Sequence, residues 1–478
     1  MRKSIINLFR HYSVRDLFYK VLERITEERK LYCSIDEKIS EENIEKQRIK
    51  KFIYQPLISI LVPTYETEKE FLEQLLETML NQTYANWELC IADASETSKV
   101  EDIISLYQED KRIIYKRLKK NEGIAENTNE AYKIATGDYI GLLDHDDILA
   151  DNALYEVVEA INKDKDIDFI YTDEDKMNSS GNIFYYPHRK PDYNKEYLRT
   201  NNYICHFVVV KKELVDKIDG WRKEFDGAQD FDFVLRCTEL AVKIKHIPKI
   251  LYHWRVHEKS TSANKYSKMY AYEAGRKAVE EHLERCNEKA RVSCLKELGT
   301  YKVSYQAQEC DTLKQMNVKK FWETDWNVEW NTTPYIIIMD DKVKRIYTRE
   351  GECFSAECES KMKIAVKEDL LGFFQRDTVS IVAAKCVDRR KVLQNGIRKN
   401  LDGTKEILMS GLNRNFRGYF KQAVLPQNVD GAKFDFVIIK TETIKDVQLA
   451  GLDEEQLCDC LRSMGLEIIQ VSDFVVEK

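Results

Sequence analysis

Three aspartates and a histidine directly follow a short apolar segment, and this group is the best candidate for chemistry in the sequence. Residues 139–143 have the pattern of a buried strand, and Asp144, His145, Asp146 and Asp147 come at its end. Ligands of open α/β sheets bind beyond the carboxyl ends of the strands. Two carboxylates one residue apart at such a place can bind a hard divalent cation, which can neutralise a diphosphate. An Asp-rich turn explains the same residues, because aspartate favours turns.

Alternating strand and helix patterns precede this segment. Apolar β-rich runs alternate with stretches of helical periodicity: strands at 57–62, 87–92 and 113–115, helices at 71–80, 100–107 and 125–136. This alternation predicts a parallel sheet with crossover helices. The first run ends at Pro63, Thr64 and Tyr65, the second ends at Asp93, and the strand at 139–143 ends in the acidic segment. These three strand ends should converge on one crevice that suits a nucleotide. The sequence contains neither a G-x-G-x-x-G nor a P-loop motif, which argues against a dinucleotide fold or a P-loop.

Composition narrows the class of protein. The chain has 478 residues, enough for two or three domains, with 43% hydrophobic and 33% charged residues as in soluble globular proteins. The net charge of -7 argues against bulk binding of nucleic acid. No apolar run approaches the roughly 20 residues needed to span a bilayer, and the start lacks the pattern of a secretory signal. The 12 scattered cysteines favour reduced thiols in a cytoplasmic protein.

Residues 1–55 differ from the rest of the chain. Apolar residues between positions 5 and 25 recur at near-helical spacing among Arg and Lys, and residues 34–51 are densely charged. A basic amphipathic helix can lie on an anionic membrane surface. The same stripe can instead pack on the main domain, and the sequence leaves both open. We expect an N-terminal helical segment and a linker here.

Seven segments then occur in a recognisable order. They are ISILVPTYE, WELCIADAS, NEGIAENTNEAYKIATGDYIGLLDHDD, YTDEDK, NNYICHF, FDGAQDFDFVLR and IPKILYHWR. Together they resemble family 2 glycosyltransferases of the GT-A fold, which build bacterial surface polysaccharides. The match runs from Pro56 to Arg255, with a weaker tail near Val292. The resemblance implies an α/β, Rossmann-like nucleotide-diphospho-sugar transferase domain at residues 56–300.

The resemblance implies a set of nucleotide-binding residues. Asp93 would accept a hydrogen bond from a ring N–H of the base, since a carboxylate only accepts. Asn121 and Gly123 precede a helix, whose start suits a diphosphate. The full implied set is Pro63, Thr64, Tyr65, Asp93, Asn121, Gly123, Asp144 and Arg255. Two positions depart from the family pattern: Ala94 stands where many relatives have a second Asp, and Thr128 where many have Arg.

The resemblance also implies a metal site and a catalytic base. Asp144 and Asp146 match the family's D-x-D, and His253 could complete a shell around Mg²⁺ or Mn²⁺; a structural role for His253 is as well supported. Asp147 is expected to cap a helix. Asp230 matches the carboxylate that deprotonates the acceptor; capping the helix at 231–240 is its alternative role.

Three further features admit two interpretations each. Asp232 would point differently from Asp230 on a helix. The carboxylates of 171–176 can bind sugar hydroxyls or order a loop, and Trp221 can form an acceptor platform or pack in the core.

The last third looks like an eroded copy of the same domain. Residues 335–339 form an apolar run that ends in Asp340 and Asp341, but Lys342 replaces the expected carboxylate. Too few residues precede this run for a nucleotide-binding half. We therefore expect residues 301–478 to form a degenerate GT-A-like α/β domain with a structural or acceptor-binding role, and a single active site in residues 56–300.

The sequence thus predicts a cytoplasmic, metal-dependent, inverting glycosyltransferase. It would move a sugar from a UDP- or dTDP-linked donor to a growing surface glycan or a lipid-linked acceptor, with no nucleic acid as partner. Peripheral contact with the inner membrane surface is an expectation that depends on the N-terminal helix. The alternative is a non-catalytic family member that acts as a scaffold in polysaccharide assembly, which Ala94 and Thr128 favour. A nucleotidyltransferase is disfavoured, because no Gly-rich basic loop lies near Pro63.

Overall fold

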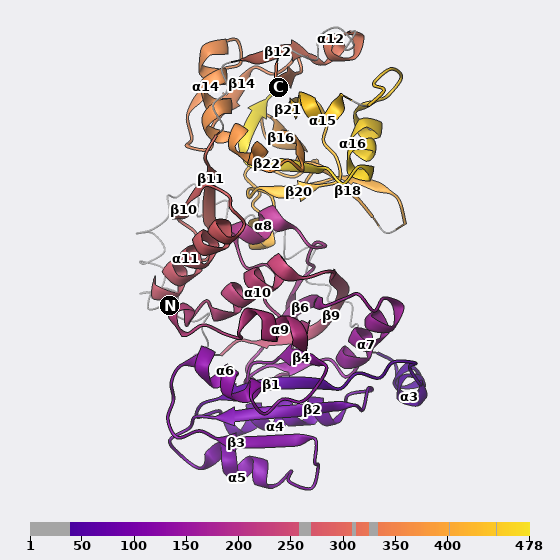
Figure 1. The fold of residues 1–478 in the computed structure, drawn as a ribbon, viewed down its shortest axis with the longest axis vertical. Coiled ribbons are helices and arrows are strands. Elements are labelled where there is room, and N and C mark those ends of the chain that lie inside the picture. Colours follow the sequence, from indigo (N-terminus) through magenta and orange to yellow (C-terminus); the bar gives the residue numbers. More distant parts are fainter. Residues whose placement is uncertain (1–38, 258–268, 308–311, 325–332, 401, 446) are drawn as a thin grey trace.

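The computed structural model describes residues 39–257, 269–307, 312–324, 333–400, 402–445 and 447–478. The amphipathic stretch predicted between positions 5 and 25 lies outside these residues. Two β-sheets follow one another along the long axis of the molecule, and α8 (Lys195–Thr200) and the hairpin of β10 (Ala290–Cys294) and β11 (Tyr301–Tyr305) lie between them (Figure 1). In the part of the chain that is described, no helix is both long and apolar enough to span a bilayer.

The first sheet is mixed and runs in the order β3-β2-β1-β4-β8-β6-β9-β5, with β7 paired to β6. Its strands are β1 Ile58–Thr64, β2 Trp87–Asp93, β3 Ile113–Arg117, β4 Tyr139–Leu142, β5 Ile148–Leu149, β6 Phe169–Met177, β7 Phe184–His188, β8 Val208–Lys211 and β9 Ile244–Arg255. The first four are parallel to one another, as the alternating pattern predicts. β8 is antiparallel to both β4 and β6, which makes the sheet mixed.

The chain reverses its direction of growth across this sheet between β1 and β4. It adds β2 and β3 on one side of β1 and then returns to place β4 on the other side. Such a switch point opens a crevice at the carboxyl ends of the strands, because the connections leave to opposite sides. The crevice therefore lies beside the ends of β1 and β4, where the acidic segment begins.

Helices cover the two faces of this sheet. They are α3 Glu41–Ile49, α4 Lys69–Leu80, α5 Lys99–Ser105, α6 Ile124–Tyr132, α7 Ala153–Lys163, α9 Lys212–Ile218, α10 Gln229–Leu240 and α11 Met269–Arg285, with a 3₁₀ turn η1 at Lys223–Phe225. α4 shows how the sequence specifies them, since Leu72, Leu75, Leu76 and Met79 recur at helical spacing and are buried. The helices predicted at 71–80, 100–107, 125–136 and 231–240 are confirmed within a few residues.

The second sheet is also mixed and has the order β12-β13-β21-β16-β22-β14-β15. Its strands are β12 Leu313–Asn317, β13 Tyr335–Met339, β14 Arg345–Tyr347, β15 Cys353–Ser355, β16 Val379–Asp388, β17 Lys391–Gln394, β20 Gln427–Val429, β21 Phe436–Lys440 and β22 Glu467–Glu477. Its helices are α12 Val318–Glu323, α14 Glu359–Asp369, α15 Thr441–Ile444 and α16 Glu454–Ser463, with 3₁₀ turns η3 Leu371–Gln375 and η4 Tyr419–Lys421. β18 (Ile397–Lys399) and β19 (Lys405–Ile407) form a separate hairpin. The origin of this half as an eroded GT-A domain stays a prediction.

One apolar cluster joins the two sheets. It continues from Leu61 of β1 through Tyr197 and Tyr305 to Phe373 and Ile469 near the second sheet, and all of these side chains are buried. The predicted boundary at residue 300 falls inside the β10–β11 hairpin, whose two strands pair across it. The second half is therefore packed on the first, and the boundary itself stays a proposal.

Candidate active site

The strand ends predicted to meet do lie together. Thr64 at the end of β1 pairs with Asp93 at the end of β2, and Leu61 pairs with Leu142 of β4. The acidic segment begins two residues after Leu142, at the same edge of the sheet. Tyr65 directly follows Thr64 and is 42% exposed, while Pro63 is half-buried. The framing role of Pro63, Thr64 and Tyr65 in a nucleotide pocket stays a prediction.

Asp93 is fully buried and already accepts several hydrogen bonds. Its Oδ1 accepts from the backbone N–H of Ser95 at 3.0 Å, from the Ser95 hydroxyl at 2.5 Å and from the Thr64 hydroxyl at 3.1 Å. Its Oδ2 accepts from the Tyr115 hydroxyl at 2.8 Å and lies 3.3 Å from Nη1 of Arg117. The N–H of a nucleotide base that reached Asp93 would have to share the carboxylate oxygens with these donors. The predicted contact of Asp93 with the base stays a prediction. Tyr115 and Arg117 are neighbours that the sequence analysis missed.

The carboxylates of the acidic segment differ sharply in exposure. The Asp144 side chain is 48% exposed and that of Asp146 is 18% exposed, whereas Asp147 is fully buried. Burial and the neighbouring carboxylates of Asp146 and Asp144 raise the pKa of Asp147 well above its usual range. Asp144 and Asp146 are thus the two members of the segment whose oxygens can reach a ligand.

Asp147 holds the acidic segment in place through hydrogen bonds to buried groups of β9. Its Oδ2 accepts a 2.5 Å hydrogen bond from the Tyr252 hydroxyl, and its Oδ1 accepts from the backbone N–H of Arg255 at 2.7 Å. The predicted helix cap is wrong, because α7 begins at Ala153 with Asn152 at the N-cap position. Asp147 instead ties the acidic segment to β9.

Arg255 is buried and turned towards the protein. Its guanidinium donates to the carbonyl of Asp146 at 2.5 Å, to the carbonyl of Ser179 at 2.8 Å and to Oε1 of Gln74 at 2.7 Å. The guanidinium also lies over the ring of Phe71, 4.6 Å from its centroid. The predicted diphosphate contact of Arg255 stays a prediction, and what the geometry shows is support for the Asp146 backbone.

Two histidines near the end of β9 contact different carboxylates, and only one of these carboxylates belongs to the acidic segment. His253 Nδ1 lies 2.6 Å from Asp175 Oδ1, and its ring packs on Phe184 with centroids 4.5 Å apart. His257 Nε2 instead lies 2.8 Å from Asp146 Oδ2. The predicted metal contact of His253 stays a prediction, and His257 contacts the acidic segment at Asp146.

The donor set around Asp146 suits a divalent cation. No group of three or more His, Cys, Asp or Glu side chains converges on one point within the described residues, so the protein alone offers an incomplete shell. A carboxylate and an imidazole in direct contact, with Asp144 nearby, match the ligands that Mn²⁺ accepts, with oxygens of a diphosphate and water completing the shell. Asp146 and His257 are therefore two suitable donors in contact, and a metal site that also includes Asp144 stays a prediction.

His206 is a member of the site that the sequence analysis missed. Its Nδ1 lies 3.3 Å from Glu174 Oε2 and its Nε2 lies 3.7 Å from Asp144 Oδ2, while the ring stacks on Tyr252 at 4.6 Å. Burial alone would lower the pKa of His206, but Glu174, Asp144 and Asp147 outweigh it and raise the pKa to about 9. The imidazole is therefore a cation beside the acidic segment at neutral pH.

Asp230 lies in the first turn of α10. Its Oδ2 accepts a 2.9 Å hydrogen bond from Nδ2 of Asn202. Burial raises the pKa of Asp230, with Asp144 adding to the rise, and His206 opposes it, which places these three side chains in one electrostatic neighbourhood. Ala228 occupies the N-cap position of α10, but hydrogen bonds from the backbone N–H groups of Phe231 and Asp230 also act on the Asp230 carboxylate and oppose the rise of its pKa, so a capping role beside catalysis stays a prediction. The role of Asp230 as base stays a prediction that this geometry favours.

The N-terminus of α6, predicted to bind diphosphate, holds a carboxylate of the protein. Asp226 Oδ1 accepts a 3.0 Å hydrogen bond from the backbone N–H of Ala125. Gly123 has φ +104°, and a Cβ there would lie 2.1 Å from Asp226 Oδ2, so glycine is required for this approach. Asn121 Oδ1 accepts from the backbone N–H of Gly123 at 3.1 Å. The diphosphate contacts of Asn121 and Gly123 stay predictions.

Several other candidates serve the fold. Asp232 is buried and accepts from Nε of Arg222 at 3.1 Å and Nε of Arg236 at 2.9 Å. Trp221 is only 3% exposed and stacks on Phe233 at 4.4 Å, so of its two expected roles the structure shows core packing. Neither Asp232 nor Trp221 offers a free face to an acceptor.

The carboxylates of β6 point into the protein. Asp173 accepts from the backbone N–H of Lys190 at 2.9 Å, and Glu174 accepts from Nζ of Lys190 at 3.2 Å. The Lys190 ammonium also donates to the carbonyl of Ile204 at 2.6 Å. This strand therefore orders the loop that carries His206.

The acidic pair of the second half is arranged differently from that of the first. Asp340 follows β13, accepts from the backbone N–H of Lys342 at 2.9 Å and is ion-paired with Lys478. The Lys478 and Lys342 charges lower the pKa of Asp340 against the effect of its partial burial. The carboxylate is thus matched by a lysine of its own chain.

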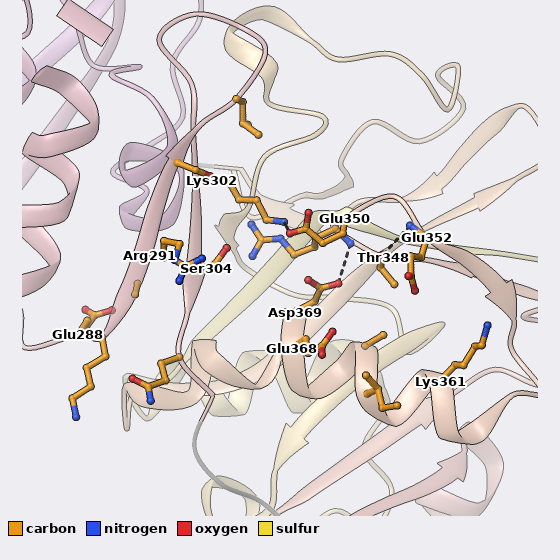
Figure 2. Close-up of a pocket in the computed structure, with 18 of the residues that line it drawn as sticks. Glu288, Arg291, Lys302, Ser304, Thr348, Glu350, Glu352, Lys361, Glu368 and Asp369 are labelled. Carbon is orange, nitrogen blue, oxygen red and sulfur yellow. Dashed lines mark hydrogen bonds and ion pairs between the residues drawn. The ribbon is translucent and has the colours of Figure 1, made fainter. Parts of the chain in front are cut away.

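A large cleft of about 1520 Å³ lies away from the acidic segment. One wall is the β10–β11 hairpin with Arg291, Lys302 and Ser304, and the other is α14 with Glu368 and Asp369 (Figure 2). Its acidic and basic side chains are intermixed, and Lys302 pairs with Glu350 across it. None of the predicted site residues lines this cleft.

Comparisons with known proteins agree with the geometry at the level of the first sheet. Residues 59–219 match the model of glycosyl transferase family 2. The chain is 42% identical over 256 residues to an uncharacterized protein of Sinorhizobium fredii, covering 53% of this chain and 28% of that protein. It is 34% identical over 250 residues to the O-antigen biosynthesis protein RfbC of Myxococcus xanthus, covering 52% of this chain and 20% of that one.

The matched region is therefore a small part of these relatives. The crystal structure of S. aureus TarS residues 1–349 aligns with a TM-score of 0.39 and 21% identity over 47% of this chain and 65% of that one. A likeness at that level carries no argument about the site.

Proposed function

Because residues 59–219 match the model of glycosyl transferase family 2, we propose that this protein transfers a sugar from a nucleotide-diphosphate donor to a glycan or lipid-linked acceptor. The observation that supports this most directly is that His206 lies 3.7 Å from Asp144 beside the strand ends at the topological switch, with Asp230 in the same electrostatic neighbourhood. A nucleotide would lie at the ends of β1 and β2, and the leaving diphosphate near Asp144 and Asp146.

The proposed reaction is a direct displacement with inversion. The acceptor oxygen attacks the anomeric carbon as the bond from that carbon to the diphosphate oxygen breaks, and the acceptor's proton passes to Asp230. A carboxylate takes up a proton more readily as its pKa rises, and burial raises the pKa of Asp230. The His206 imidazolium lies where negative charge grows on the leaving diphosphate and can stabilise it.

The residues that would hold Mg²⁺ or Mn²⁺ are Asp144, Asp146 and His257 rather than His253. Bound there, the cation would supply positive charge against the diphosphate. Arg255 and Asp147 keep the Asp146 backbone in place and so orient its carboxylate.

A non-catalytic scaffold is the rival proposal, and two positions favour it. Ala94 is 3% exposed where many relatives carry a carboxylate, and Thr128 uses its hydroxyl to bond the Ile124 carbonyl at 2.7 Å. Neither residue can contact a diphosphate by charge. We also propose a cytoplasmic location, which the scattered cysteines favour, whereas contact with the inner membrane surface rests on the stretch between positions 5 and 25, outside the described residues.

The test is a panel of donors: UDP-glucose, UDP-N-acetylglucosamine, UDP-glucuronic acid and dTDP-rhamnose. Each is screened by thermal shift with and without Mn²⁺, and hydrolysis to free nucleotide is then measured for the donor that stabilises most. We expect one donor to raise Tm in a Mn²⁺-dependent way and to be hydrolysed. Binding without any hydrolysis or transfer would favour the scaffold, and no binding of any donor would contradict the proposal.

A further inference from the structure

We propose that the second sheet takes part in the reaction by holding α8, so that Asn202, two residues after this helix, orients the carboxylate of Asp230. This rests on the proposed function, in which Asp230 is the base. The second half would then be required for transfer without contributing any reacting group. Asn202 is a positioning residue in this account, and Asn428 of β20 is its remote support.

Both the oxygen and the nitrogen of the Asn202 side-chain amide are hydrogen-bonded. Its Oδ1 accepts from the backbone N–H of Cys205 at 3.3 Å, which leaves Nδ2 to donate to Asp230 Oδ2 at 2.9 Å. An amide with its oxygen engaged in this way cannot flip without losing both bonds. Asn202 therefore holds Oδ2 of the Asp230 carboxylate in a defined orientation.

The segment that carries Asn202 forms one unit with α8. Tyr203 stacks on Tyr197 of α8 with centroids 4.8 Å apart, and its hydroxyl accepts from the backbone N–H of Asn194 at 2.9 Å. The backbone N–H of Asn201 donates to the Tyr197 carbonyl at 3.2 Å. Asn202 lies between Asn201 and Tyr203, so a movement of α8 is transmitted to it directly.

Hydrogen bonds from β20 of the second sheet fix the start of α8. Asn194, the N-cap of α8, donates from Nδ2 to the Asn428 carbonyl at 2.8 Å and accepts from the Asn428 backbone N–H at 2.9 Å. Asn428 Oδ1 accepts from the backbone N–H of Glu196 at 3.0 Å. The Tyr197 hydroxyl donates to the Phe420 carbonyl at 2.8 Å. An N-cap shared with a strand of the other sheet ties the helix start to that strand.

A buried ionic network holds the other face of α8. Arg199 donates from Nη2 to Glu288 at 2.7 Å and from Nη1 to the Tyr305 hydroxyl at 2.9 Å. Arg376, which directly follows η3, pairs with Glu196 at 2.8 Å and with Glu288 at 3.0 Å. All these charged side chains are less than a tenth exposed. Because buried charges tolerate little misplacement, α8 is confined by residues of the second half.

The experiment is a double-mutant cycle on the hydrolysis or transfer of the donor chosen from the panel above. Asn202→Ala should lower kcat about tenfold or more, with donor KM within about twofold, because the base is misaligned while the donor site is intact. Asn428→Ala should lower kcat several-fold in the natural chain and have no further effect in the Asn202→Ala background. Asn400→Ala is the matched control, since within the described residues its side-chain amide donates to Thr404 in the β18–β19 hairpin, away from α8.

Hydrogen exchange supplies a readout that needs no donor. Asn428→Ala should speed amide exchange in residues 201–206 at an unchanged Tm, and Asn400→Ala should not. Unchanged exchange, wild-type kcat in Asn202→Ala, or an equal effect of Asn428→Ala in both backgrounds would overturn the proposal. If Asp230→Asn itself keeps full turnover, the proposed base is wrong; if it loses turnover while Asn202→Ala does not, only the positioning role fails.

Discussion

Replacing Arg199 with methionine tests how strongly the two sheets are joined. The Arg199 side chain is fully buried, and its guanidinium donates to Glu196 at 3.1 Å, to both oxygens of Glu288 at 2.8 and 2.7 Å, and to the Tyr305 hydroxyl at 2.9 Å. Methionine keeps much of the side-chain volume and removes the charge. Glu196 and Glu288 would then share Arg376, with Lys195 3.7 Å from Glu288.

Two arguments give the same magnitude. Breaking a buried ion pair by removing one partner costs about 3–5 kcal/mol, because a charge is left without compensation. Burial would raise the pKa of Glu288, but Arg199 and the other cations lower it from 4.5 to about 2. A carboxyl with that shift gains about 3 kcal/mol of stability at neutral pH, most of which depends on its cations.

Urea unfolding measured at several pH values is the assay. Because the pKa of Glu288 is lower in the folded state, its contribution is present above the unfolded pKa and is lost as pH falls from about 4.5 towards 2. The natural chain should therefore lose stability over that range more steeply than Arg199→Met. At pH 7 the variant should be less stable by about 3–5 kcal/mol. A difference below about 1 kcal/mol at pH 7 would refute the argument that this network joins the halves.

Three further substitutions test the site and its surroundings. Asp146→Ala should abolish Mn²⁺-dependent donor binding in thermal shift with little change in the Tm of the free protein; donor affinity that survives both this change and EDTA would contradict the metal assignment. Tyr252→Phe removes a donor from buried Asp147 and should cost about 1–3 kcal/mol in urea unfolding, and an unchanged midpoint would contradict it. Asp340→Ala should leave turnover unchanged, because this carboxylate pairs with Lys478. Calorimetric titration with nucleotide should still give one binding site per chain. Lost turnover with normal folding would mean a second site.

The sheet and its crevice could be predicted from the sequence because both follow from local patterns. Strands such as β2 are mostly apolar and buried along their whole length, and the polar residue at the end marks the edge of a parallel sheet. The meeting of Thr64 and Asp93 required only that the strands be neighbours. The second sheet was less predictable, since its short strands pair in a mixed order that no local pattern specifies.

The details of the site could not be predicted in the same way. Asp147 has the position of a helix cap in sequence, but it contacts Tyr252, which lies 105 residues away. His206 and His257 reach the acidic segment through loops, so no spacing in the sequence connects them with Asp144 or Asp146. His253 was the more obvious candidate because it lies on the strand of a family motif, and Asp175 holds it elsewhere.

The measurement that tests the central claim most directly is sugar transfer by Asp230→Asn. Asparagine keeps the shape of the side chain but cannot take a proton, so donor binding should stay near that of the natural chain. Transfer and donor hydrolysis should fall by about two to four orders of magnitude. A variant that folds, binds the donor and turns over at the natural rate would contradict the account, because the acceptor's proton would then have to leave by another group.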